Sequence, residues 1–140
     1  MKIKHFVIEN QVGELTAMAE KMMELAKKWE LPQAITVNIN LVIEEALTNI
    51  IFYAFPDNNK HDIKVSVTLN NNMLTIEITD DGIPFNPLSQ QQPDITLPAE
   101  ERPVGGLGIF LISQIMDKMD YKRHENQNIL TLSKSIEYEH

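Results

Sequence analysis

An acidic and an amide side chain lie four residues apart in the apolar stretch VIEEALTNII, residues 42–51. At this spacing Glu45 and Asn49 share one face of a helix. A carboxylate can serve as a general base, and an amide oxygen is a suitable ligand for a hard cation such as Mg²⁺. Asparagine is also a poor residue for a helix interior, so its presence needs a reason. The alternative interpretation is a solvated stripe opposite the core.

A second group of polar residues, Thr79-Asp80-Asp81-Gly82, lies where a predicted strand ends. A carboxylate in this place can accept a hydrogen bond from a ligand amino group, and Gly82 lets the backbone come close. The alternative is an ordinary turn, because Asp-Gly is a common turn dipeptide.

Three glycines, Gly105, Gly106 and Gly108, begin the segment VGGLGIFLISQIM, residues 104–116. Glycines at a helix start cost stability. They also allow close backbone approach, and the free N–H groups of a first helical turn bind phosphate. The segment is not a P-loop, because no Gly-Lys-Ser/Thr follows, and it lacks the preceding strand of a dinucleotide fingerprint. A flexible hinge is the alternative.

The periodicity of apolar residues predicts the elements that must position these groups. The irregular segment 81–104, which contains prolines 84, 87, 93, 98 and 103, is long enough to be functional. We expect an α+β two-layer sandwich, in which a mixed, mostly antiparallel sheet is covered on one face by three helices. The predicted strands are 2–8, 63–69, 74–78, 120–125 and 128–134, and the predicted helices are 11–29, 33–54 and one from the glycines to about Met119.

The composition predicts one globular domain over residues 1–140. A net charge of −8 argues against a direct nucleic-acid partner, which requires a basic surface. Cysteine is absent and the N-terminus lacks the features of a signal peptide, so we expect a cytoplasmic protein. We also expect no membrane association, because no apolar run looks long enough to span a bilayer.

The order of these motifs resembles the ATP-binding fold shared by gyrase, heat-shock chaperones, histidine kinases and mismatch-repair ATPases. The resemblance covers nearly the whole chain. The short form is most similar to the bacterial anti-sigma-factor serine-protein kinases. The segments that carry the likeness are EEALTNIIFYAF, DDGIPFNP, GGLGIFLI and NQNILTLSK.

This resemblance implies that ATP and Mg²⁺ are the cofactors. Two departures from the family pattern are Pro84, where a glycine is usual, and Ile129-Leu130-Thr131 in place of a late Gly-Thr pair. Arg102 either reaches a phosphate from the lid or only flanks it. By resemblance, Glu45 is the general base, Asn49 the Mg²⁺ ligand, Asp80 and Gly82 the adenine site, residues 86–104 the ATP lid, Gly105, Gly106, Leu107 and Gly108 the phosphate-binding segment, and Thr131 a late polar residue near the adenine.

The implied activity is that of a protein serine/threonine kinase that phosphorylates a small anti-sigma-factor antagonist. A sigma factor is a second candidate partner, and members of this branch often form homodimers, so we expect a homodimer. The alternative is a nucleotide-gated binding module without phosphotransfer. The catalytic half of a histidine kinase is disfavoured, because we expect no preceding dimerising helix with a phosphorylatable histidine.

Overall fold

The computed structural model describes residues 1–87 and 106–137, with only the backbone for residues 106–109. Its elements confirm the predicted α+β class. They follow the order β1 (Lys2–Glu9), α1 (Glu14–Lys28), α2 (Gln33–Tyr53), β2 (Asp62–Asn70), β3 (Met73–Asp80), α3 (Gly106–Ile115), β4 (Lys118–His124) and β5 (Gln127–Ser135).

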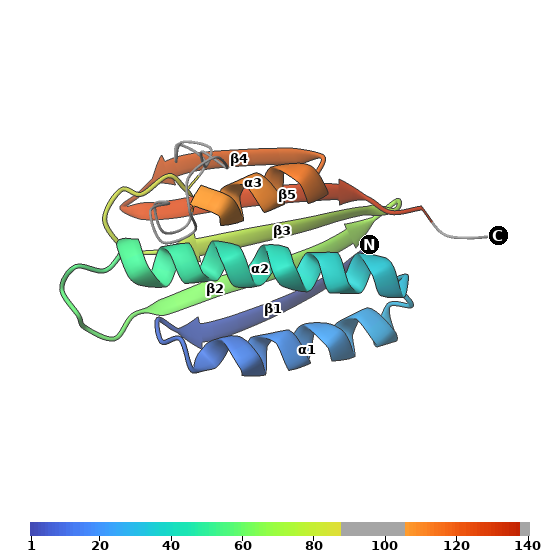
Figure 1. Ribbon diagram of the computed structural model, residues 1–140, viewed down its shortest axis with the longest axis horizontal. Helices are drawn as coiled ribbons and strands as arrows, with labels where there is room; N and C mark the ends of the chain where they lie inside the picture. Colours follow the sequence, from blue (N-terminus) through green and yellow to red (C-terminus); the bar gives the residue numbers. More distant parts are fainter. Residues whose placement is uncertain (88–105, 138–140) are drawn as a thin grey trace.

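One five-stranded sheet, in the order β1-β2-β3-β5-β4, forms the second layer. Its four strand pairings are all antiparallel. The expected antiparallel character is therefore confirmed, whereas the expected admixture of parallel pairs is not found among the described strands. All three helices lie on one face of this sheet (Figure 1). The other face has no helix from the described residues, which confirms the predicted two-layer sandwich.

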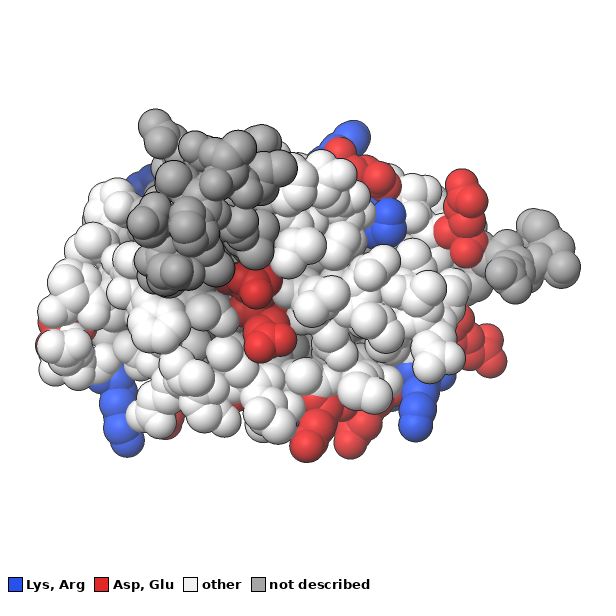
Figure 2. Space-filling model, viewed as in Figure 1, with Lys and Arg blue, Asp and Glu red and all other residues white. Residues whose placement is uncertain are grey.

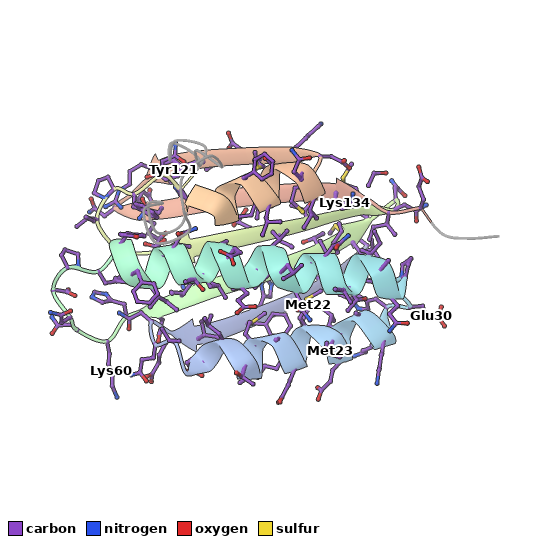
Figure 3. The ribbon with its side chains drawn as sticks, viewed as in Figure 1. Met22, Met23, Glu30, Lys60, Tyr121 and Lys134 are labelled. Atoms are coloured by element: carbon purple, nitrogen blue, oxygen red, sulfur yellow. The ribbon has the colours of Figure 1, made fainter. Side chains whose placement is uncertain are left out.

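The core lies between the helices and the sheet because alternate strand residues point towards the helices. In β3, Leu74, Ile76 and Ile78 are fully buried. The helices show the matching 3.6-residue period. On α1, for example, Met22 is fully buried, whereas its neighbour Met23 is 50% exposed (Figure 3).

Two tight turns connect the sheet hairpins. Asn71 and Asn72 between β2 and β3 have φ of 50° and 64°, and Glu125 and Asn126 between β4 and β5 have φ of 49° and 65°. Asparagine tolerates this left-handed conformation better than most residues. The run Asn70-Asn71-Asn72 is typical of such a turn.

The third helix is shorter than predicted. It ends at Ile115, and β4 begins at Lys118, whereas the apolar pattern suggested a helix to about Met119. The backbone N–H of Asp117 instead donates to the carbonyl of Ser133 at 2.9 Å, and the Asp117 carboxylate accepts from the N–H of Ser135 at 2.7 Å. Pairing with β5 therefore ends the helix earlier than local periodicity indicates.

Helix α2 is long and apolar enough to cross a membrane by length and composition alone, with a mean hydropathy of 1.3. The expectation that no such run exists is wrong on these criteria. In the fold, however, α2 lies between α1 and α3 and packs on the sheet (Figure 1). The core helix of a globular protein passes the same test.

Candidate nucleotide-binding site

The end of β3 buries the carboxylate of Asp80, which is only 3% exposed. Its Oδ1 accepts two hydrogen bonds of 2.9 Å, from the backbone N–H of Gly82 and from Nδ2 of Asn128. The first bond is that of an Asx turn, so the predicted turn is present. Burial raises the pKa of Asp80 above its ordinary value, although the two hydrogen bonds oppose this effect. A buried, partly satisfied carboxylate can recognise a ligand donor.

Gly82 packs directly against the C-terminal end of α2. A Cβ atom on this residue would lie 2.3 Å from the carbonyl oxygen of Ala54. The same carbonyl accepts a hydrogen bond of 2.8 Å from the N–H of Ile83. The ring of Phe85 then packs on Tyr53 of α2, with ring centroids 5.6 Å apart. Glycine is thus required for the close approach of this loop to the helix.

Asn128, which the sequence analysis did not identify, holds the loop from the β5 side. Its Nδ2 donates to Asp80 and also to the carbonyl of Ile83 at 2.8 Å. Its Oδ1 accepts from the N–H of Phe85 and from the hydroxyl of Tyr121 on β4. A sequence signal existed: asparagine is rare in strands, and Asn128 shares the period of the buried Leu130 and Leu132.

The middle of α2 positions Glu45 and Asn49 on one face, one turn apart. Asn49 is only 2% exposed, so the alternative of a solvated stripe is wrong for this residue. Within the described part of the chain, its Nδ2 has no hydrogen-bond partner. Such an unpaired buried polar atom is unusual, and Asn40 Oδ1 on the same helix is a second one.

Glu45 is half-buried next to the exposed Glu44. Burial, and secondly the negative charge of Glu44, raise the pKa of Glu45 above its ordinary value. Figure 2 shows an acidic patch over α2, and these two glutamates are the acidic residues of that helix. A carboxylate with a raised pKa is better suited to take up a proton near neutral pH.

The segment expected to bind phosphate, residues 105–108, is described only in part. Gly106 is the first residue of α3, and Leu107 and Gly108 belong to its first turn. The start of α3 lies at the same end of the molecule as the ends of α2 and β3 (Figure 1). Gly105, Arg102 and the expected lid from residue 88 onwards lie outside the described residues.

Thr131 does not join the other candidate residues. It pairs with Glu77 in the sheet, while Asp80 pairs with Asn128. Because side chains alternate along a strand, Thr131 points to the face opposite Asn128, Leu130 and Leu132. The structure therefore places Asn128, and not Thr131, beside Asp80.

Comparisons with known proteins identify the family and support the fold. The sequence profile of the family described as "Histidine kinase-like ATPase domain" matches residues 8–134. The chain is 33% identical over 106 residues to "Serine-protein kinase RsbW" of Bacillus cereus (strain AH820), an alignment that covers 73% of this chain and 65% of the relative. It therefore spans about two thirds of the length of that protein.

A second relative is "Serine/threonine-protein kinase BtrW" of Bordetella bronchiseptica, at 26% identity over 95 residues, with 68% of this chain and 67% of the relative covered. Among solved structures, the histidine kinase domain of the Erythrobacter litoralis EL346 blue-light activated histidine kinase has a TM-score of 0.54 at 15% identity. That match covers 89% of this chain and 60% of the other, and it supports the fold. On the profile match, which extends over most of its length, this chain belongs to the histidine kinase-like ATPase domain family.

Proposed function

We propose that this chain is an ATP-dependent protein serine/threonine kinase of the anti-sigma-factor type, and that it phosphorylates a small anti-sigma-factor antagonist. The observation that carries the proposal is the pair on α2, a half-buried Glu45 one turn before a buried Asn49 with an unpaired amide nitrogen. The similarity to two proteins named as serine or serine/threonine kinases supports the choice of substrate.

Asp80 and Gly82 form the purine end of the proposed site. The buried Asp80 carboxylate would accept a hydrogen bond from the adenine amino group. Gly82 holds the loop after Asp80 against the C-terminal end of α2. A side chain at position 82 would occupy the space of the Ala54 carbonyl, so this approach of the loop requires glycine.

Asn49 would hold Mg²⁺, which supplies charge neutralisation on the phosphates when bound. The fit follows from its unpaired buried amide. A flip of the amide exchanges oxygen for nitrogen, so the unpaired position can present an oxygen, which hard cations prefer. Backbone N–H groups at Gly106, Leu107 and Gly108 in the first turn of α3, with Gly105 before them, would bind phosphate oxygens.

Glu45 would accept the proton of the attacking serine hydroxyl. Its raised pKa and its place one turn from Asn49 on the same helix support this role. The sigma factor as a second partner, the homodimer, the contribution of Arg102 from the lid and the cytoplasmic location extend the proposal on the resemblance to the anti-sigma-factor kinases.

The test is single-turnover transfer from labelled ATP to antagonist proteins encoded by the same genome, together with calorimetric ATP affinity. Glu45→Gln should leave affinity near wild type and reduce transfer by about 10²- to 10⁴-fold, the usual contribution of a positioned base. Glu44→Gln, one residue away and exposed, is the matched control and should transfer at close to the wild-type rate at neutral pH.

Equal transfer rates in the wild type and Glu45→Gln would remove the base assignment. A wild-type protein that binds ATP but phosphorylates none of the antagonists would indicate the nucleotide-gated binding module instead.

A further inference from the structure

The side chain of Asn128 connects three separate segments at the end of the sheet. It bonds to Asp80 at the end of β3, to Ile83 and Phe85 in the following loop, and to Tyr121 on β4. Figure 3 shows Tyr121 on β4, at the outer edge of the sheet. Asn128 itself is only 3% exposed, so these contacts replace water for the whole amide.

The contacts determine which way the amide faces. Its nitrogen donates to two oxygens, Oδ1 of Asp80 and the carbonyl of Ile83, and its oxygen accepts from two donors. A flipped amide would place oxygen against oxygen and nitrogen against N–H. All four positions are therefore used, and the orientation is fixed.

This orientation also determines which carboxylate oxygen remains for a ligand. Oδ1 of Asp80 receives both of the described hydrogen bonds, from Asn128 and from the N–H of Gly82. Among the described residues, Oδ2 receives none. Asn128 thus occupies one oxygen of Asp80 and leaves the other for a ligand donor.

We propose that Asn128 is a specificity-determining positioning residue, which orients the Asp80 carboxylate so that the site selects adenine over guanine. The inference rests on the proposed function, in which Asp80 recognises the base. Adenine carries an amino group at C6, which donates to a carboxylate. Guanine carries a carbonyl oxygen at the same position, and this oxygen is repelled by an ionised carboxylate but accepts a bond from a protonated one.

Charged groups act on Asp80 from its own loop and from β4. Asp81, the next residue, disfavours the ionised form, while Arg123 favours it and also donates to the Gly82 carbonyl at 2.7 Å. Among the described residues, Glu45 on the helix above the sheet is not one of the charged groups that act on Asp80. Loss of the Asn128 donor leaves burial less opposed, so less of Asp80 would be ionised at a given pH.

The experiment measures the dissociation constants of ADP and GDP for the wild type and Asn128→Ala at pH 7.5. The wild type should prefer ADP. In the variant, ADP affinity should fall by about 10- to 100-fold, the range for a hydrogen bond to a charged group. GDP affinity should change much less, so the ratio of the two constants should fall. A residue that only stabilised the fold would weaken both nucleotides by the same factor.

A pH series provides the second readout. Between pH 7.5 and 5.5 the preference of Asn128→Ala for ADP should decrease more steeply than that of the wild type, because the Asp80 carboxyl takes up a proton at higher pH. Titration of the nucleotide phosphates cancels in the ratio of ADP to GDP.

Tyr121→Phe covers the case in which Asn128→Ala does not fold. It removes one contact of the Asn128 oxygen on an edge strand, and should lower the preference in the same direction by a few-fold. Ser133→Ala, on the opposite face of β5, is the control and should leave both constants unchanged.

The outcomes separate the two proposals. A wild type that binds neither nucleotide, or binds both equally, contradicts the proposed adenine site itself. A wild type that prefers ADP, with the same preference and the same pH profile in Asn128→Ala and Tyr121→Phe, overturns only the role of Asn128.

Discussion

The backbone of Gly82 packs against Ala54 so closely that position 82 has no room for a side chain. A Cβ there would lie 2.3 Å from the Ala54 carbonyl oxygen and 2.7 Å from the Ala54 Cβ. This contact joins the loop after β3 to the end of α2. Both partners are buried, and the obstructing oxygen already accepts the N–H of Ile83. The close approach of the loop after Asp80 to helix α2 therefore requires glycine at position 82.

Gly82→Ala should therefore separate the loop from the helix. We expect a loss of about 1–3 kcal/mol in the free energy of unfolding, which is typical of overpacking, together with weaker ATP binding. Gly13→Ala is the matched control, because nothing lies within 4 Å of its Cβ position. Urea denaturation and calorimetry measure both effects. If the two variants were equally stable, the contact would be unimportant.

Asp80→Asn should abolish or strongly weaken ATP binding while the protein stays folded. The substitution removes the negative charge, and hydrogen bonds to a charged group are roughly twice as strong as neutral ones. Asp81→Asn is the adjacent control, since that exposed carboxylate bonds to His61 and not to Asn128. Calorimetry with ATP and Mg²⁺ decides the matter, and unchanged affinity in Asp80→Asn would exclude Asp80 from the site.

The pH dependence of phosphotransfer should reflect Glu45. Its pKa is raised above the ordinary 4.5 by burial and by the charge of Glu44. If the ionised carboxylate is the base, the transfer rate should fall as pH decreases through this raised value. Glu44→Gln should move the midpoint to lower pH, because it removes one of the two causes. A midpoint that does not move would show that the pH profile belongs to another group.

His61 joins the loop after β3 to the turn after α2. Its Nδ1 lies 2.9 Å from Asp81 and its Nε2 lies 2.8 Å from Asp57, and its ring stacks on Phe55. Hydrogen bonding to Asp57, followed by the contacts with Asp81, raises the pKa of His61, and a hydrogen bond from the Asn59 N–H, followed by that from His61, lowers the pKa of Asp57.

The stability that this cluster contributes should depend on pH. A raised histidine pKa stabilises the fold at pH values below 6.5, and the effect is lost as pH rises through the folded value. His61→Ala should therefore lower the free energy of unfolding more at pH 5.5 than at pH 8.5. His124→Ala, at an exposed position, is the control variant. A constant difference in urea unfolding at the two pH values would contradict the prediction.

Thr131→Ala should leave ATP affinity close to the wild-type value. Its side chain lies on the sheet face away from the helices, unlike that of Asn128. Calorimetry on the two alanine variants compares the residue suggested by resemblance with the one suggested by geometry. A loss of affinity in Thr131→Ala equal to that in Asn128→Ala would show that the geometric assignment is incorrect.

Local patterns in the sequence were sufficient for the elements and the class of fold. The alternation of Ile63, Val65, Val67 and Leu69 predicts β2. The motif order from Glu45 to the glycines at residues 105–108 indicates the family that the profile match confirms. Such patterns are readable because one face of each element must be buried, and burial imposes a period of 2 or 3.6 on the chain itself.

The tertiary structure decided the contacts that make the candidate site. Asp80 and Asn128 are 48 residues apart in the chain, and only the pairing of β3 with β5 places them side by side. Contacts between segments distant in sequence also decide three other features. They are the early end of α3, the burial of Asn49 and the outward direction of Thr131. Register between strands and packing between layers depend on partners distant in sequence, so a local pattern could identify the residues but could not show which of them meet.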